Sequence, residues 1–342
     1  MHYLRNAWYL VAWANELPAG TLLSRTIAEQ PMVMFRDQEG VARALRDWCP
    51  HRFAPLSKGR LVCGTVRCGY HGLMFDGHGN CVDNPHGPVS QALRARSFAV
   101  VERHWALWTW LGESTPEPDR IPDLSFIERA PEPARVAGHL ETNANYELMV
   151  DNIMDLTHAD YLHADSLGGG INTRARSEVS ESPDTITVKW SADDDLFAPA
   201  HDAFLPQPGQ RADFRTEVHW SAPGVMRQRV LFGPAGRLVE EGTDSWTAHV
   251  MTPKGARSTH YFFCHTNERL SREAASAPWI RAILLKAFQT EDAPMLEAQQ
   301  RQLGEAEFWS LTPVLLAIDK AAVLVRRRLA SLIDAERNSV GP

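Results

Sequence analysis

Two short motifs near the start of the chain combine cysteine with histidine at close spacing. Cys49 and His51 form a Cys-x-His motif, and Cys68 and His71, after 16 intervening residues, form a Cys-x-x-His motif. Two thiolates and two imidazoles in this order suit a [2Fe-2S] cluster in which the cysteines hold one iron and the histidines the other. Zinc is the alternative, since two Cys and two His also bind zinc. The Cys-x-x-Cys and His-x3-His spacings common at structural zinc sites are absent, which favours the cluster.

A second set of candidate ligands lies near the middle of the chain, where His158 and His163 are five residues apart. Five residues turn an ideal α-helix by about 140°, so one regular helix would not direct both imidazoles at one ion. A bend, a π-bulge or a helix that ends near His158 would bring them together. Non-haem Fe(II) oxygenases use two His and one carboxylate and leave positions open for O2 and substrate.

The carboxylate of such a site has to come from another part of the chain. Asp292 is the preferred acid, because it lies in an otherwise apolar helical segment and therefore has reason to face inward. Pro294 follows it and is expected to bend the helix there. The acids considered are Asp160, Asp165, Asp244, Glu291 and Asp292.

The elements around the first pair of motifs are predicted to be β-strands. Short apolar or alternating segments are separated by Gly, Pro and Asp, which favours strands and tight turns. Both metal-binding motifs are therefore expected on loops, between the strands of a small sheet. The segments are 8–12, 31–35, 41–45, 75–82 and 98–111.

A Pro- and acid-rich segment at 112–119 is typical of a linker, and 342 residues are long for one core. We predict domains at 1–113 and 114–342. Beyond the linker, alternating segments and helical patterns indicate an α+β domain, with an antiparallel sheet flanked by helices. The strands are expected near 183–190, 212–220, 225–233 and 244–251, and the helices at 145–164, 273–303 and 313–336.

The last of these helices is predicted to begin with Thr312 as its N-cap and a proline at its first position, and to pack through apolar residues such as Leu315 and Leu316. Among the five cysteines, Cys63, Cys81 and Cys264 are expected to be small buried side chains.

The overall charge gives no sign of a polyanionic partner. The formal net charge is -7, and no stretch of 18 apolar residues occurs. We expect no nucleic acid partner, no membrane segment and a cytoplasmic location. An odd number of cysteines, five, favours thiols and metal ligands over a disulfide framework.

Several segments together resemble the oxygenase components of Rieske non-haem iron oxygenases. The likeness extends over nearly the whole chain and is closest to the O-demethylase branch represented by vanillate and dicamba monooxygenases. The segments that carry it are 49–57 (CPHRFAPLS), 68–73 (CGYHGL), 150–158 (VDNIMDLTH), His163 and Glu291-Asp292.

The resemblance implies an N-terminal all-β Rieske [2Fe-2S] domain and a C-terminal catalytic domain with mononuclear Fe(II). It implies that His158, His163 and Asp292 hold that iron. It also implies that Asp155 hydrogen-bonds an iron-ligating His and links it to a cluster His of a neighbouring subunit, so that the enzyme works as a head-to-tail homotrimer. In related enzymes an Asn lies near the iron at about the place of Asn152.

The implied activity is that of a terminal oxygenase. Electrons would come from NAD(P)H through a separate reductase, with or without a ferredoxin. The preferred reaction is O-demethylation of a vanillate-like methoxylated aromatic acid to a phenol and formaldehyde. Alternatives are oxidation of another aromatic or N-methyl substrate, a Rieske ferredoxin-like electron carrier, and a zinc-stabilised binding module.

The substrate pocket is expected where the sheet faces the iron. His249 lies where the dicamba-oxidising relative has a His that contacts its substrate. An aromatic carboxylate would be recognised by one such donor among apolar walls. Arg227 and Arg229 are alternative partners for a substrate anion, although Arg at alternating strand positions more often faces solvent.

Overall fold

The chain folds into two compact units. The structure, a computed structural model, describes residues 3–197, 205, 207, 209–238, 243–267 and 277–339. The first unit is Met1–Asp123 together with Thr252–Ala256 and Glu336–Pro342, and the second is Leu124–Met251 with Arg257–Ala335. These units are defined by contacts, so the domain limits expected from the sequence, 1–113 and 114–342, stay a prediction.

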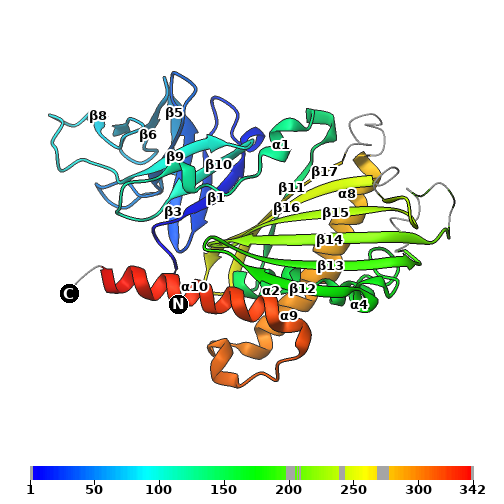
Figure 1. The fold of residues 1–342 in the computed structure, drawn as a ribbon. Coiled ribbons are helices and arrows are strands. Elements are labelled where there is room, and N and C mark those ends of the chain that lie inside the picture. Colours follow the sequence, from blue (N-terminus) through cyan, green and yellow to red (C-terminus); the bar gives the residue numbers. More distant parts are fainter. Residues whose placement is uncertain are drawn as a thin grey trace. The chain divides into compact units, whose positions relative to one another are not determined.

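The first unit is built on a six-stranded antiparallel sheet in the order β1-β10-β9-β4-β3-β2 (Figure 1). β1 and β10 are buried along their whole lengths, because both consist of aromatic and aliphatic residues with few polar interruptions. The predicted segment 98–111 is two strands that turn at His104 and Trp105, both with positive φ. The strands are Trp8–Trp13 (β1), Leu23–Ile27 (β2), Gln30–Arg36 (β3), Ala42–Arg46 (β4), Ser97–Arg103 (β9) and Ala106–Trp110 (β10).

A smaller four-stranded sheet in the same unit carries the two Cys/His loops. Its core contains Cys49 and Cys68 among apolar neighbours such as Leu56, Val66 and Phe75. Cys81 is buried as expected, whereas Cys63 is exposed, so the prediction for Cys63 was wrong. Its positive φ of 46° places it in a tight turn between strands instead of in the core. The strands are Arg60–Val62 (β5), Thr65–Arg67 (β6), Met74–Phe75 (β7) and Cys81–Asp83 (β8).

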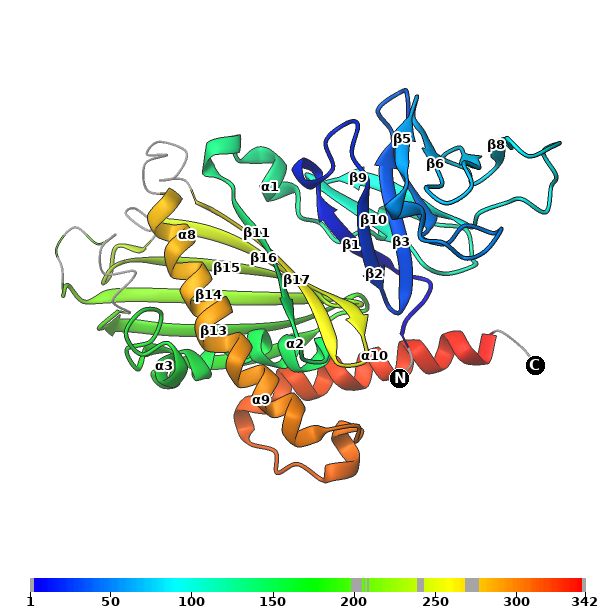
Figure 2. The same ribbon diagram turned by 180° about the vertical axis from the view of Figure 1, so that it is seen from behind.

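The second unit is a seven-stranded antiparallel sheet in the order β11-β17-β16-β15-β14-β13-β12. Its long strands alternate buried and partly exposed residues, which is the pattern of a sheet covered on one face. Helix α8 (Ala277–Leu285) runs across that face and leads through a π-helical segment into α9 (Ala293–Leu303) (Figure 2). The strands are Val136–Thr142 (β11), Arg176–Glu181 (β12), Thr185–Asp195 (β13), Ala212–Ser221 (β14), Val225–Pro234 (β15), Thr243–Gly255 (β16) and Ser258–Asn267 (β17).

Further helices, most of them short, flank the sheet, and the longest of those described is α10 at 20 residues. None of the described helices is long and apolar enough to cross a bilayer. The helices are α1 (Ser125–Arg129), α2 (Tyr146–Met154), η5 (Leu156–His158), α3 (Ala159–Leu162), α4 (Ile171–Arg174), η7 (Lys286–Asp292), η8 (Phe308–Leu311), η9 (Ala317–Asp319) and α10 (Lys320–Ser339).

The prediction that the last helix starts at Thr312 was wrong. Thr312 adopts a left-handed conformation with φ 48°, so it ends η8 instead of capping a new helix. The chain is then irregular until η9, where the Asp319 carboxylate accepts from the backbone N–H of Leu316 at 2.6 Å. Leu315 and Leu316 are exposed in this chain, so they do not pack as expected.

Candidate metal centres

The two Cys/His loops have the same backbone geometry. Cys49 N–H donates to the carbonyl of Ala54 and Cys68 N–H donates to that of Leu73, in each case five residues ahead. The carbonyls of the two cysteines accept from residues four ahead, Phe53 and Gly72, and both of these have positive φ. Each motif is therefore a tight turn held by its own backbone hydrogen bonds.

These turns direct cysteine inward and histidine outward. Cys49 and Cys68 are each 2% exposed, His51 is exposed, and the rings of His51 and His71 lie 4.6 Å apart. Burial, and then the charge of the neighbouring Cys68, raise the pKa of the Cys49 thiol to about 11, so a bound cation is needed to keep it a thiolate at neutral pH. Two buried thiols beside two outward imidazoles fit a cluster with mixed ligands.

The second centre exists because the helix expected at 145–164 is broken. α2 ends at Met154, and Asp155 has an extended conformation with φ -135° and ψ 101°. A 3-10 turn then ends at His158, and the short α3 leads from there to His163. The two imidazole rings come within 5.3 Å of each other. A regular helix would hold the two imidazoles about 140° apart, and the break removes this constraint. A helix that ends near His158 was one of the expected possibilities.

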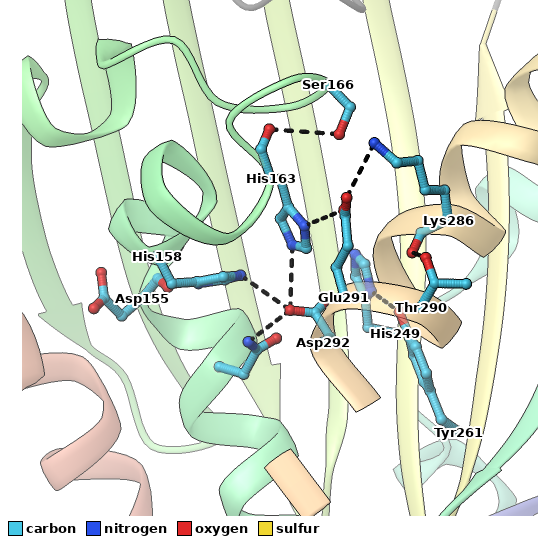
Figure 3. A network of polar contacts seen from close by, with 11 residues as sticks. Asp155, His158, His163, Ser166, His249, Tyr261, Lys286, Thr290, Glu291 and Asp292 are labelled. Carbon is cyan, nitrogen blue, oxygen red and sulfur yellow. Dashed lines mark hydrogen bonds and ion pairs between the residues drawn. The ribbon is translucent and has the colours of Figure 1, made fainter. Parts of the chain in front are cut away.

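Asp292 comes to the same place from a distant part of the chain. It is the last residue of a π-helical segment between α8 and α9, with Pro294 in the first turn of α9. One of its oxygens, Oδ1, lies 3.5 Å from His158 Nε2 and 3.2 Å from His163 Nε2. Figure 3 shows the three side chains pointing toward one another.

The three donor atoms lie within 4.8 Å of one another, and His163 and Asp292 are buried. Ligands bonded to one ion at about 2.1 Å are separated by about 3 to 3.5 Å, so the spacing suits a single metal ion. Two neutral imidazoles and one carboxylate, with one side less enclosed at His158, match the donor set of non-haem Fe(II) oxygenases.

Outer hydrogen bonds orient both imidazoles. His158 Nδ1 lies 2.6 Å from the backbone carbonyl oxygen of Asp155, and His163 Nδ1 lies 2.8 Å from Glu291 Oε2. Each Nδ1–H donates outward, which leaves each Nε2 lone pair facing Asp292. Lys286 pairs with Glu291 at 3.1 Å. Burial lowers the pKa of His163, but contacts with Asp292 and Glu291 outweigh it and the pKa is raised overall.

The side chains of Asp155 and Asn152 lie beside this centre, though Asp155 is arranged differently from what was expected. Its carboxylate accepts from the N–H and the hydroxyl of Thr157, at 3.0 and 3.1 Å. The histidine contact is made by its backbone carbonyl instead, because Asp155 ends α2 and its side chain turns toward η5. Asn152 Nδ2 donates to Asp292 Oδ1 at 3.1 Å, so its amide restrains the candidate ligand.

His249 is buried in the sheet beneath the helices that carry Asp292. Its Nδ1 lies 2.7 Å from the Tyr261 hydroxyl and its Nε2 lies 2.9 Å from Gln228 Oε1. Burial lowers the pKa of His249 to about 3, and burial also raises that of Tyr261, so both are neutral. Because an amide oxygen only accepts, Nε2 carries the proton and Nδ1 accepts from Tyr261.

Gln228, Tyr261 and Phe288 are partners of His249 that the sequence alone did not indicate. Phe288 lies edge-on to the His249 ring, with centroids 5.7 Å apart. These contacts depend on strand register and on the π-helical segment, and no sequence motif predicts either of them.

Arg227 and Arg229 lie on the opposite face of the sheet from His249. Gln228 contacts His249, and successive residues of a strand alternate between the two faces. Both arginines lie near the Trp246 ring, and Arg229 pairs with Asp244 at 2.8 Å. Neither therefore faces the helices of the candidate iron site.

Comparison with known proteins agrees with this arrangement. A model of the Rieske [2Fe-2S] domain matches residues 7–95, and one of the vanillate O-demethylase oxygenase C-terminal domain matches residues 142–335. Two relatives are the oxygenase components of chloroacetanilide N-alkylformylase from Rhizorhabdus wittichii and of dicamba O-demethylase from Stenotrophomonas maltophilia. The first is 36% identical over 337 residues and the second 35% over 339, with coverage of 98% of this chain in both and of 97% and 99% of the relatives.

A solved structure supports the same conclusion along the whole chain. The crystal structure of dicamba monooxygenase bound to dicamba superposes with a TM-score of 0.88 at 34% identity, covering 99% of this chain and 100% of that one. The chain belongs to the Rieske non-haem iron oxygenases, as an oxygenase component. Within that family it is closely related to the vanillate and dicamba O-demethylases.

Proposed function

We propose that this oxygenase component O-demethylates a methoxylated aromatic acid. The reaction consumes the methyl ether, O2, two electrons and two protons, and it yields a phenol, formaldehyde and water. The observation that carries the proposal is the convergence of His158, His163 and Asp292 in a chain that also has the Cys49/His51/Cys68/His71 loops. A Rieske ferredoxin-like carrier would need only the Cys/His loops that hold the cluster.

In this proposal each set of side chains holds one metal group. Cys49, His51, Cys68 and His71 hold the [2Fe-2S] cluster, while His158, His163 and Asp292 hold the mononuclear Fe(II). When bound, the cluster supplies single electrons and the iron supplies the site of O2 activation. Glu291 and the Asp155 carbonyl orient the imidazoles, and Asn152 restrains Asp292.

His249 is the proposed polar contact for the substrate. Its Nε2–H donates to an oxygen of Gln228 in the structure, and a substrate carboxylate oxygen could take that place as acceptor. The ring is neutral, so it provides direction and not charge. Phe288 and Tyr261 pack around it as aromatic walls, which suits an aromatic ring.

We also propose a head-to-tail homotrimer in which Asp155 links the iron centre to the cluster of a neighbouring subunit. His51 is exposed, so the imidazole side of the cluster can be reached. Asp155 and His158 line a pocket of about 310 Å³ in the second unit, and Val314 at its rim is 88% exposed. An exposed apolar rim beside a site that must receive electrons favours a protein partner there.

Mixing two inactive chains tests the trimer. Asp292→Ala keeps the cluster and loses the mononuclear iron, whereas Cys68→Ala loses the cluster and keeps the iron. In a head-to-tail ring the first chain supplies electrons to the second, so co-expression restores part of the turnover. A mass near three times 38.3 kDa is expected for the wild type. No restored turnover in a mixed oligomer of that mass would count against electron transfer between subunits.

Electrons are proposed to come from NAD(P)H through a separate reductase, with or without a ferredoxin. A reductase of this kind places the enzyme in the cytoplasm, where NAD(P)H is available. Iron analysis separates the oxygenase from the carrier: an oxygenase holds three irons per chain, two in the cluster and one mononuclear, and a carrier holds two.

The decisive experiment is a formaldehyde assay over a panel of methoxylated benzoic acids, with O2 and a surrogate reductase. We expect one formaldehyde and one phenol for each O2 consumed. The matched control is the corresponding ethoxy acid, which would release acetaldehyde. Full loading with both kinds of iron and no aldehyde from any aryl ether would overturn O-demethylation.

Oxidation of an N-alkyl group is the second candidate. It is favoured by the 36% identity to the chloroacetanilide N-alkylformylase component, which is as high as that to the dicamba relative. An amide substrate has no carboxylate, so its turnover should be less sensitive to His249→Leu than that of a benzoate. Activity on N-alkyl anilides and none on aryl ethers would show that the substrate is an N-alkyl amide and not a methyl ether.

A further inference from the structure

A second group of two histidines and one carboxylate lies at the edge of the seven-stranded sheet. His139 and Glu141 are two residues apart on the edge strand β11, so they share one face. β11 pairs with β17, where His260 lies directly opposite Glu141. Figure 2 shows these two strands side by side. Nothing in the proposed reaction uses this group.

The donor atoms of this group are close together. His139 Nε2 lies 3.1 Å from His260 Nδ1, and His260 Nδ1 lies 3.6 Å from Glu141 Oε1. All three donors are within 4.8 Å of one another, as are those of the candidate iron site. For a tetrahedral ion with bonds of about 2.0 to 2.1 Å, neighbouring ligand atoms are separated by about 3.3 Å. The observed spacing is close to that value.

The surroundings hold the ligands while leaving one side open. His260 is 1% exposed, whereas the Glu141 side chain is 50% exposed. The His139 ring stacks on Phe262, with centroids 4.5 Å apart, which restrains its rotation. An ion here would have two oriented imidazoles below it and a carboxylate that can adjust, with a remaining position for water.

The same atoms also permit a simpler arrangement, a hydrogen bond between the two imidazoles beside a surface acid. That arrangement accounts for the distance of 3.1 Å between the two nitrogens. In that arrangement the Glu141 carboxylate lies 3.6 Å from His260 Nδ1, within ion-pair distance and beyond hydrogen-bond distance. An ion that contacts all three groups would also account for their convergence.

We propose that His139, Glu141 and His260 form a binding site for a divalent transition-metal ion of the zinc class. Imidazole nitrogen together with carboxylate oxygen is a donor set that such ions prefer. The ion would join the edge strand β11 to β17. β11 runs directly into the turn where Asn145 caps α2, the helix that carries Asn152, so the ion stabilises the start of that segment.

This site is separate from the candidate iron centre. Tyr261 follows His260 in β17 and contacts His249, and adjacent residues of a strand face opposite sides of the sheet. The ion is therefore expected to leave the iron content unchanged, which gives the test a readout that does not depend on turnover.

The test is Zn²⁺ binding to the holoenzyme. The protein with its full iron content is equilibrated with ZnCl2, desalted, and analysed for zinc and iron per chain by mass spectrometry. We expect about one zinc retained per chain, no loss of iron, and a zinc absorption edge spectrum with two imidazole nitrogens. Thermal unfolding of the second unit should shift upward by a few degrees with zinc, since ligands that bind the folded state stabilise it.

Three substitutions and one control sharpen the result. His139→Gln and His260→Gln should each weaken zinc binding at least about 100-fold, and Glu141→Gln about tenfold. Glu141 is exposed, so its variant tests the site even if the buried His260 variant fails to fold. The control is His219→Gln, which removes a partly buried imidazole that pairs with Glu217 at 3.3 Å and is not part of the three-residue group; it should bind zinc like the wild type.

The proposal is overturned by any of three outcomes. The holoenzyme retains no zinc, or zinc uptake is matched by an equal loss of iron, or His139→Gln and Glu141→Gln bind zinc as tightly as the control does. The second outcome would mean that zinc had entered the iron centre.

Discussion

The two candidate metal centres of the family's reaction are built in opposite ways. The cluster ligands all lie within residues 49–71, on two turns that repeat the same backbone hydrogen bonds. The ligands of the iron centre come from a broken helix at 158–163 and from a π-helical segment that ends at Asp292. A centre made of local turns depends on a few neighbouring residues, whereas the other depends on how helices pack on the sheet.

The centres also differ in how they meet solvent. Cys49 and Cys68 are buried while His51 is exposed, so one end of the cluster lies at the surface. At the iron centre His163 is 2% exposed, and only His158 is open to a moderate degree. An electron relay needs a surface to exchange electrons, and oxygen chemistry needs a protected site.

The largest expected effect is the loss of turnover when electron transfer between the two centres is interrupted. Asp155→Asn keeps an oxygen that accepts from Thr157 but loses the negative charge. If Asp155 connects the centres, turnover falls by about 100-fold or more while cluster and mononuclear iron remain. Product formation and iron content are measured together. Thr157→Val, which removes only the hydroxyl contact, is the control and should lose much less; an active Asp155→Asn enzyme would contradict the relay.

The second prediction tests whether the iron centre, unlike the cluster, depends on how helices of the second unit pack together. Arg326 on α10 is 7% exposed and pairs with Asp151 at 2.6 Å and Glu147 at 2.9 Å, both on α2. Arg326→Met leaves two acids without that cation and should cost the second unit about 3 kcal/mol of unfolding free energy. The temperature at which the cluster absorbance is lost on heating should be the same in Arg326→Met as in the wild type.

A matched control for that variant is Arg328→Met on the same helix. Arg328 pairs with Glu181 at 3.2 Å, and that acid is 45% exposed, so its loss should change the unfolding free energy by less than about 1 kcal/mol. Equal destabilisation by the two variants would show that the buried position of Arg326 is not what matters.

The third prediction concerns the orientation of a single ligand. Glu291→Gln replaces the charged acceptor of His163 Nδ1 by a neutral one. Retention of the mononuclear iron should weaken by about 10- to 100-fold, with the cluster unaffected. Dialysis against a chelator followed by iron analysis measures it. Lys286→Met removes the partner of Glu291 and should have a smaller effect; equal loss of both kinds of iron would argue against a role specific to His163.

The smallest effect is a pH dependence of stability from His249. Its pKa is lowered from 6.5 to about 3 in the folded state, so between these values the unfolded chain binds a proton that the folded chain does not. Stability is therefore lost as pH falls below 6.5, by about 1 kcal/mol between pH 7 and pH 5.5.

Denaturant unfolding at the two pH values measures this contribution. His249→Gln should be less destabilised by acid than the wild type by that amount. An unchanged pH slope in His249→Gln would show that the imidazole is not held neutral by burial.

The sequence went furthest where structure is local. The Cys/His loops are recognisable because a tight turn places its ligands at a constant spacing. The strands of the first unit follow from short apolar segments between Gly and Pro. The helical break near His158 was one of several possibilities, and its choice depends on Asp155, whose carboxylate bonds forward to Thr157. The start assigned to the last helix was wrong because Pro313 follows a left-handed Thr312.

By itself, the sequence determined the family, the order of the two units and the types of residues available to hold metals. The tertiary structure decided which of five acids meets His158 and His163, because Asp292 arrives there through helices packed on the sheet. It also decided that His249 meets Gln228 and Tyr261, and that His139, Glu141 and His260 share one place. Strand register sets both, and register is a property of paired strands that no single segment contains.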